Sequence, residues 1–385
     1  MFSSRQKEKI GAPGIDEIRR CFPVTQRYIY LNHAAVSPLS VDVSTAMTRM
    51  ITQVQNEGAY RWVEWEKMYA ETRSLAAGLI GAEPHEISLL KNTSEGISVV
   101  ASGLRWVEGD RILVPVVEFP SNVYPWLQLQ ERGIAVDFVP ESRGVISIDE
   151  IESRITGRTR LLAISYVQFL SGFRCDLDAL GELCSSRGIY FFVDAIQGAG
   201  LFPLDVSAAR IDFLAADGHK WLMGPEGCGI FYCRSGLRDK IRPPVVGWRS
   251  VKDRANFLDY RLDYVDDGVR FEAGTPNTVG TAGLKAALEF IRRWGRELIE
   301  QRVLQVTDYL VERIRERGFE VLSPRNADSE KSGIVSFRCS ENSNALCRSL
   351  WNKRIVVASR QGWIRVSPHF YNTEEEIDQF LAELK

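Results

Sequence analysis

Six short apolar runs constrain the fold of this chain more than any other feature of the sequence. They are rich in valine, isoleucine and aromatic residues and cover residues 112–117, 135–139, 161–166, 189–194, 213–216 and 229–233. Most of them do not alternate with polar residues, which is typical of strands that are buried on both faces. The stretches between them have helix length, and the one over 176–187 is followed by Gly188, a residue type that often ends a helix. We therefore predict an α/β fold with a largely parallel sheet covered by helices.

The C-terminal part of the sequence has a different character, with longer amphipathic segments. Apolar residues recur at three- and four-residue spacing over 284–318 and predict two helices, whereas residues 334–339 and 354–358 predict strands. Thr373 and Glu376 form a capping box that opens a last helix. The predicted division is an N-terminal arm packing on the small domain (1–30), a large domain (31–280) and a small α+β domain (281–385).

Charge and hydropathy exclude several classes of function. The 385 residues include 48 Lys and Arg against 50 Asp and Glu, and no basic run favours nucleic-acid binding. The apolar runs fall far short of the roughly 20 residues that span a bilayer. The N-terminus is polar and does not resemble a secretory signal. We therefore expect neither a nucleic-acid partner nor a membrane segment.

Cysteine and histidine usage bears on compartment and metal chemistry. The seven cysteines are odd in number and include no CxxC pair, which favours reduced thiols and predicts a cytoplasmic protein. The four histidines are too far apart in the sequence for a helical or finger-type ligand set, so no metal is predicted. A metal site assembled from distant segments stays open as an alternative.

Polar residues follow three apolar runs, and each of them has a functional and a structural interpretation. Asp194 ends one run where an open α/β sheet places its ligands, although a turn or cap is the alternative. Lys220 lies among apolar residues and glycines, which suits a buried amine that forms a Schiff base, although an exposed loop lysine is commoner. Residues 91–96 place hydroxyl groups at a strand-to-helix junction, which can hold a phosphate or be a plain N-cap.

Taken together, these three features fit one cofactor, pyridoxal 5'-phosphate (PLP). PLP requires a phosphate cradle, a lysine that holds its aldehyde and a carboxylate that keeps its pyridine nitrogen protonated. The lysine can later move protons at the substrate Cα. We therefore predict PLP as the cofactor.

Five segments of the chain match one family in the family's own order. They cover residues 30–35, 93–95, 193–197, 218–220 and 270–277. With them the chain resembles the class V aminotransferase-type enzymes of PLP fold type I, a group that includes cysteine desulfurases, selenocysteine lyases, isopenicillin N epimerase and kynureninase. The resemblance runs from about residue 30 to the C-terminus and implies a mainly parallel, seven-stranded-type sheet in the large domain.

The resemblance also implies roles for the residues around the cofactor. Lys220 carries the cofactor, Asp194 pairs with the pyridine nitrogen and Gln197 hydrogen-bonds the phenolic oxygen. The phosphate end is assigned to Thr93, Ser94 and His219, with Asp217 beside them. Thr275 reaches the phosphate of the neighbouring subunit's cofactor, so the implied active unit is a homodimer.

Further residues are implied to face the substrate. Arg365 matches the arginine that binds the substrate α-carboxylate, with a solvent-facing strand arginine as the alternative. Phe119 stands at the ring-stacking position, with core packing as the alternative, and Gln168 lies in a loop that lines up with the substrate loop of kynureninases. His33 is a candidate proton carrier, although a lone histidine is more often a packed or capping residue.

Several positions depart from the family pattern. Phe119 stands where desulfurases and lyases often have a histidine, and an aromatic ring cannot move a proton. The segment over 356–365 is short and has no cysteine, which disfavours desulfuration through a protein persulfide. The assisting asparagine is replaced by Phe169, and Asp217 replaces a serine. An ionised Asp217 would repel a phosphate, so either it caps backbone N–H groups or other residues hold the phosphate.

The resulting prediction is a PLP-dependent enzyme that acts at the Cα of an amino-acid-like small molecule, foremost as an aminotransferase. The alternatives are a C–S lyase that works by α,β-elimination without a persulfide cysteine, an epimerase and a kynureninase-like hydrolase. A non-catalytic binding or regulatory subunit with the same fold is the alternative from a different class.

Overall fold

A seven-stranded sheet forms the centre of the molecule in the computed structural model, which describes residues 14–384. Its strands are β2 (Ile87–Leu90), β3 (Arg111–Pro115), β4 (Ala135–Val139), β5 (Thr159–Ser165), β6 (Tyr190–Asp194), β7 (Phe213–Asp217) and β8 (Gly229–Cys233). The strand order is β2-β8-β7-β6-β5-β3-β4. Only β8 runs antiparallel to its two neighbours, and the other pairs in this sheet are parallel. The predicted α/β fold with a mainly parallel seven-stranded sheet is confirmed.

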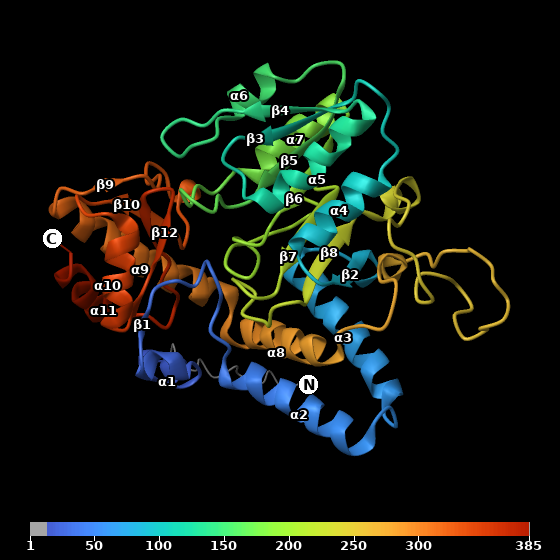
Figure 1. Cartoon of the computed structure of the whole chain (residues 1–385), viewed down its shortest axis with the longest axis horizontal. Helices are drawn as coiled ribbons and strands as arrows, with labels where there is room; N and C mark the ends of the chain where they lie inside the picture. The colour runs from blue at the N-terminus through green and yellow to red at the C-terminus, as the bar shows by residue number, and fades with distance from the viewer. Residues whose placement is uncertain (1–13, 385) are drawn as a thin grey trace, which may run out of the picture.

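Helices cover both faces of this sheet, as Figure 1 shows. The longer ones are α2 (Val41–Glu57), α3 (Trp62–Ile80), α4 (Thr93–Gly103), α7 (Leu177–Arg187) and α8 (Thr278–Trp294). The shorter ones are α1 (Ile15–Arg20), α5 (Tyr124–Leu127) and α6 (Ile148–Ser153). Helix α7 begins and ends where the sequence predicts, because the Asp176 side chain caps its first turn and Gly188 adopts a left-handed conformation with φ of 68°.

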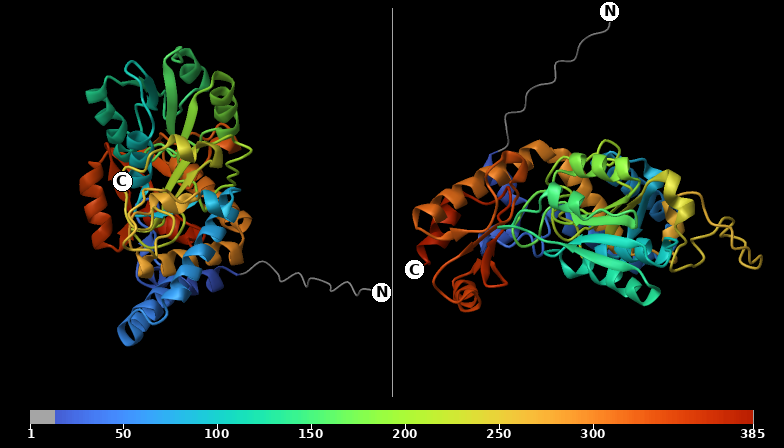
Figure 2. Two further views of the ribbon diagram at one scale, coloured as in Figure 1. Left: turned by 90° about the vertical axis from the view of Figure 1, so that its right-hand side faces the viewer. Right: turned by 90° about the horizontal axis from the view of Figure 1, so that it is seen from above.

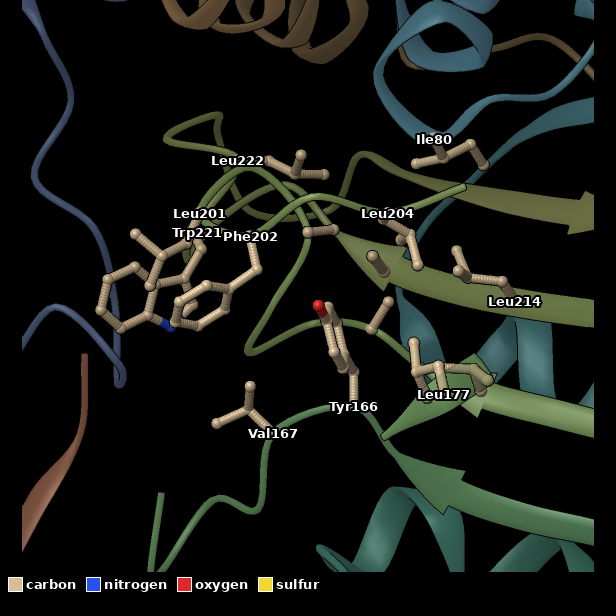
Figure 3. Close-up of a cluster of buried hydrophobic side chains, with 14 of the residues drawn as sticks. Ile80, Tyr166, Val167, Leu177, Leu201, Phe202, Leu204, Leu214, Trp221 and Leu222 are labelled. Carbon is tan, nitrogen blue, oxygen red and sulfur yellow. The ribbon is translucent and has the colours of Figure 1, made fainter. Parts of the chain in front are cut away.

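The sheet separates two layers of apolar side chains. Alternate strand residues such as Phe191 and Val193 pack toward α3 and α7, whereas Phe192 and Phe213 pack toward α4 and α5. Figure 3 shows part of the first layer beyond the carboxyl ends of the strands, where Tyr166, Phe202 and Trp221 lie together. Because both faces are buried, the apolar runs carry no polar alternation.

A second, four-stranded antiparallel sheet forms the C-terminal part. It has the order β12-β13-β10-β9 and consists of β9 (Glu320–Val321), β10 (Val335–Arg338), β12 (Ala358–Arg360) and β13 (Trp363–Val366). The helices α9 (Arg296–Glu316), α10 (Ser343–Asn352) and α11 (Glu374–Ala382) pack with it, and α11 begins at the predicted capping box of Thr373 and Glu376. The strand predicted over 354–358 is divided between β12 and β11 (Ile355–Val356) because the two belong to different sheets.

The first described residues contact the C-terminal part. Strand β1 (Ile29–Tyr30) pairs with β11, and Arg19 of α1 donates to Glu376 at 2.9 Å. Residues 1–13 of the predicted arm lie outside the described residues. The predicted boundary at 280/281 falls inside α8, which packs on α2 and α3. The division into domains therefore stays a prediction.

The described part of the chain was predicted to contain no membrane segment, no disulfide framework and no metal site. None of its helices is long and apolar enough to cross a membrane. The seven cysteines, all within residues 14–384, are free, and no cluster of potential metal ligands is found in that part of the chain.

The chain between residues 251 and 266 forms a long loop that projects from the body in Figures 1 and 2.

A buried ion pair ties the segment over 270–277 to the large sheet. Arg73 of α3 donates to both carboxylate oxygens of Glu272, at 2.8 and 2.6 Å, and the backbone N–H of Leu89 in β2 donates to the same carboxylate. Arg73 is 8% exposed and Glu272 is 5% exposed. The pair thus joins a helix, a strand and a family motif.

Replacing Arg73 with alanine is expected to destabilise the protein by about 3–5 kcal/mol, because it leaves the Glu272 carboxylate buried without its partner. Arg187→Ala removes an arginine from an exposed pair with Glu152 and is the matched control, with an expected change within about 1 kcal/mol. Equilibrium urea unfolding followed by tryptophan fluorescence measures both variants. Equal effects of the two substitutions would contradict this role for the pair.

Candidate active site

A cavity of about 460 Å³ lies at the carboxyl ends of β6 and β7. Its wall is formed by segments that are far apart in the sequence and come from both parts of the molecule. The lining residues are Ala34, Ala35, Val36, Asn92, Thr93, Ser94, Phe119, Ser121, Phe169, Asp194, Ile196, Gln197, Asp217, His219, Lys220, Arg360 and Arg365. Nine of the twelve site residues predicted from the sequence or its family resemblance are among them. The other three are His33, Gln168 and Thr275.

Lys220 and Asp194 supply opposite charges in this cavity. Asp194 is the last residue of β6, is 2% exposed and accepts a hydrogen bond from the backbone N–H of Ile196 at 3.0 Å. Burial raises its pKa, and the Lys220 ammonium partly opposes that shift. Burial likewise lowers the pKa of Lys220, with Asp194 opposing and Arg365 adding to the shift. A lysine in this setting is neutral, and hence nucleophilic, at lower pH than a lysine in water.

The N-terminus of α4 forms one end of the cavity. Asn92 caps this eleven-residue helix by accepting from the backbone N–H of Glu95, and Thr93 and Ser94 form its first turn. The hydroxyl of Ser94 donates to that of Ser121 at 2.8 Å. A helix N-terminus with hydroxyl groups around it is suited to hold a phosphate.

Asp217 also lies at this end of the cavity, where its carboxylate contacts groups of the protein itself. Its Oδ1 accepts from the backbone N–H of Gly218 at 2.7 Å, and its Oδ2 lies 3.0 Å from Nδ1 of His219. Its own backbone N–H donates to the hydroxyl of Thr93. Of the two arrangements that the sequence leaves open for Asp217, the structure has the one in which the carboxylate caps a backbone N–H.

Aromatic residues form another part of the wall. The ring of Phe119 lies 5.4 Å from Nζ of Lys220 and packs edge-to-face against Phe169, with ring centroids 5.3 Å apart. Phe119 remains 41% exposed, so its face is available to a flat ring in the cavity. Phe119 therefore lines the cavity and is not packed in the core, which was the alternative for this residue.

Arg365 projects into the cavity from β13. It is 2% exposed, and its Nη1 donates to the backbone carbonyl of Phe169 at 2.9 Å, while its Nε has no hydrogen-bond partner in the described structure. Arg360 of β12 lines the same wall, and the two strands meet in a tight turn at Gln361 and Gly362. This short turn leaves no loop that could carry a cysteine, and none of the described residues that line the cavity is a cysteine.

Three predicted site residues lie elsewhere. His33 is fully buried in a stack with His369, with ring centroids 3.9 Å apart, and burial lowers its pKa to about 3. His33 is not among the residues that line the cavity, so its role as proton carrier stays a prediction. Gln168 is 1% exposed and donates to Glu118 at 2.7 Å, behind the cavity wall. Thr275 is exposed on the surface.

The sequence interpretation missed Arg360 and Glu118. Glu118 is 6% exposed and accepts from Asn122, from both the N–H and the hydroxyl of Ser165, and from Gln168. Burial raises its pKa. Its place directly before Phe119 is a sequence signal that could have pointed to it, whereas nothing local shows that Arg360 faces the same cavity as Arg365.

The residues present fit PLP. The cavity offers an amine at Lys220, a buried carboxylate at Asp194, an aromatic face at Phe119 and a helix N-terminus with hydroxyl groups at the other end. These are the groups that a phosphorylated pyridine aldehyde requires. The Arg365 guanidinium adds a partner for a carboxylate.

Comparisons with known proteins agree with this chemistry. The sequence profile described as aminotransferase class-V matches residues 29–380. A probable cysteine desulfurase of Methanothermobacter thermautotrophicus is 32% identical, with 96% of each chain covered. An uncharacterized aminotransferase of Bacillus subtilis, YcbU, is 28% identical over 96% of this chain and 97% of its own.

Solved structures share the whole architecture. The apo cysteine desulfurase of Thermococcus onnurineus NA1 has a TM-score of 0.88 at 30% identity, with 99% of this chain and 98% of that chain covered. The cystine C–S lyase C-DES in complex with its product cysteine persulfide has a TM-score of 0.88 at 27% identity, covering 94% and 98%. A C-DES mutant with glycine covalently linked to the PLP cofactor has a TM-score of 0.89 at 26% identity, covering 94% and 98%. The chain therefore belongs to the aminotransferase class-V family, and its cofactor is PLP.

Proposed function

We propose that this protein is a C–S lyase, which cleaves the Cβ–S bond of a sulfur-containing amino acid by α,β-elimination without a protein persulfide. The observation that carries the proposal is the composition of the cavity wall, which combines Lys220 and Arg365 with a second arginine and no cysteine. Relatives whose names refer to cysteine desulfurase and cystine C–S lyase support chemistry on sulfur amino acids. We rank this reaction ahead of the transamination that the sequence favours, which the comparisons leave untested.

Each residue has a defined task in the proposed reaction. When bound, PLP supplies an electron sink that stabilises negative charge at the substrate Cα. Arg365 holds the α-carboxylate through two parallel hydrogen bonds, and Lys220 removes the Cα proton. The rings of Phe119 and Phe169 exclude water from the reacting atoms. Asp194 keeps the pyridine nitrogen protonated because its carboxylate is negatively charged beside it.

The departure of the sulfur is the step for which the cavity offers the fewest suitable residues. Phe119 cannot donate a proton, and the one imidazole among the described lining residues, that of His219, lies beside Asp217 at the phosphate end. A sulfur that leaves readily as an anion therefore suits this site better than one that must be protonated. The disulfide of L-cystine provides such a leaving group, and the Arg360 guanidinium provides a positive charge in the same cavity.

The reaction balances with water as the only further reactant. The Cα–H and Cβ–S bonds break, the sulfur leaves with the bonding electron pair, and water hydrolyses the remaining unsaturated amine to pyruvate and ammonia. L-Cystine thus gives pyruvate, ammonia and cysteine persulfide, whereas L-cysteine gives pyruvate, ammonia and sulfide.

Incubation of the holoenzyme with L-cystine is expected to release pyruvate and ammonia in equal amounts, together with a persulfide, and L-cysteine should react more slowly. Lys220→Ala should reduce the rate by about 10²–10⁴-fold, because the base at the Cα is lost. Mass spectrometry of the products and an ammonia assay measure both. Lys353→Ala, at an exposed position directly after α10, is the control that should keep the rate.

Other product patterns would contradict the proposal. A 2-oxo acid that forms only with an added 2-oxo acceptor and without ammonia would indicate transamination. An inverted amino acid or a C–C cleavage product would indicate the epimerase or kynureninase-like alternative. The absence of any product from a protein that binds PLP would favour the non-catalytic alternative.

We also propose that the active unit is a homodimer in which Thr275 reaches the cofactor of the partner. The exposed apolar side chains of Tyr60, Trp62 and Val63 at the start of α3 support an interface, because such groups are costly to leave in water. The projecting loop adds Phe257 and Leu258, which are 72% and 85% exposed.

Thr275→Ala is expected to weaken PLP binding by about tenfold through the loss of one hydrogen bond to a charged group. The effect would arise although Thr275 does not line the cavity of its own chain. Equilibrium dialysis of the apoprotein with PLP, with sedimentation velocity for the oligomeric state, tests this. Thr52→Ala, whose hydroxyl bonds only to the carbonyl of Thr48 in its own helix, is the control. A monomeric protein with full PLP affinity in the Thr275 variant would overturn the proposal.

A further inference from the structure

We propose that Trp221 is a positioning residue, which fixes the side-chain amide of Gln197 so that it presents an N–H donor to the cofactor's phenolic oxygen. Trp221 directly follows Lys220 in the sequence, and Gln197 lines the cavity. This role concerns the electronic state of the bound cofactor and does not depend on which reaction follows.

Both ends of the Gln197 amide have a partner of defined hydrogen-bonding type. Its Oε1 accepts from the indole Nε1 of Trp221 at 2.7 Å, and its Nε2 donates to the backbone carbonyl of Ala34 at 3.0 Å. An indole N–H can only donate and a carbonyl can only accept, so the two partners demand the same orientation of the amide. The orientation follows from the chemistry of the partners and not from the nearly identical shapes of the amide oxygen and nitrogen.

The fixed amide leaves one group free for the cavity. Nε2 of a glutamine carries two hydrogens, and the bond to Ala34 uses one of them. Gln197 is 2% exposed, and its second N–H is the donor that it can offer to a molecule in the cavity. A flipped amide would offer the oxygen instead, which repels a negatively charged phenolic oxygen. Trp221, together with the carbonyl of Ala34, therefore fixes the orientation in which Gln197 attracts the phenolic oxygen.

Packing holds the indole in place from several sides. Trp221 is fully buried, and its ring lies 4.9 Å from the ring of His33 and 5.3 Å from that of His369 between centroids. Gly333 lies so close that a Cβ there would be 2.1 Å from the indole edge. Leu201 and Phe202 belong to the same apolar cluster, and Figure 3 shows them beside the indole. The ring cannot turn its N–H away from Gln197 without displacing these neighbours.

The other partner of Gln197 is held by the C-terminal part of the chain. The backbone N–H of Ala34 donates to the hydroxyl of Ser367 at 2.9 Å, and that of His33 donates to the carbonyl of Ser367 at 3.0 Å. Ser367 follows Arg365 by two residues, so the segment that carries the substrate arginine also positions the carbonyl of Ala34. The buried stack of His33 and His369 joins the same two segments, which gives His33 a packing role beside the cofactor.

Trp221→Phe removes the indole N–H and keeps an aromatic ring. A hydrogen bond donated to the phenolic oxygen stabilises negative charge on that oxygen and weakens its attraction for the proton on the nitrogen that links the cofactor to Lys220. Loss of this hydrogen bond therefore raises the pKa of the linking nitrogen. The midpoint of the pH-dependent change in visible absorption is therefore expected to rise by about one pH unit, a tenfold change in proton affinity. Gln197→Leu should give a similar rise in the midpoint. The double variant should give no more than the larger single effect, because the two substitutions disrupt the same hydrogen bond to the phenolic oxygen.

The matched control is Trp294→Phe, because Nε1 of Trp294 has no hydrogen-bond partner in the described structure. This variant should leave the midpoint unchanged. An unchanged midpoint in Trp221→Phe would overturn the proposal. Single effects that add fully in the double variant would also overturn it, because Trp221 would then act independently of Gln197.

A second measurement applies if Trp221→Phe does not fold. The protein has nine tryptophans, whose indole N–H groups can be observed by NMR after ¹⁵N labelling. Gln197→Leu should shift one indole signal and speed its exchange with D₂O, because Trp221 loses its acceptor. Nine signals with unchanged positions and exchange rates would contradict the inferred hydrogen bond.

Discussion

The attraction between Lys220 and Asp194 is the interaction on which the site depends, because both charges lie where water is largely excluded. Burial disfavours the charged form of each, raising the pKa of Asp194 and lowering that of Lys220, while each partly restores the charge of the other. A lysine poised in this way can be neutral when it attacks an aldehyde and positive when it stabilises a bound anion. The same carboxylate can hold a protonated pyridine nitrogen.

The central sheet brings these two residues together. In the register of the parallel strands Asp194 pairs with Ala215, and β7 ends two residues later at Asp217, just before the turn that carries Lys220. The second sheet contributes Arg365, and Ser367, directly after the same strand, accepts from the backbone N–H of Ala34, whose carbonyl accepts from Gln197. The cavity is therefore complete only when both sheets close on it.

Much of this arrangement could be predicted from the sequence. Strands buried on both faces leave unalternated apolar runs, and Asp194 and Lys220 follow such runs directly. The family resemblance added Arg365 and Phe119. By contrast, residue type does not show whether a side chain faces the cavity or the core, which is why the sequence does not reveal that Gln168 and His33 are buried outside the cavity lining.

Other features could not be derived from the sequence, and most of them depend on contacts between distant segments. The cap that Asp217 forms on Gly218 rests on a turn geometry that the sequence does not specify. Glu118 is held by residues up to 50 positions away, and Trp221 meets Gln197 across 24 positions. Arg360 shares a wall with Arg365 because the hairpin turn between them is short.

The most direct test of the central claim is to locate the covalent attachment of the cofactor. The holoenzyme would be reduced with borohydride, digested and analysed by mass spectrometry, with Lys220→Ala treated in parallel. We expect a phosphopyridoxyl group on Lys220 and none on the variant's corresponding peptide, together with loss of the protein's visible absorption in the variant. An unlabelled Lys220 peptide, or labelling of another lysine with equal yield in both proteins, would contradict the account.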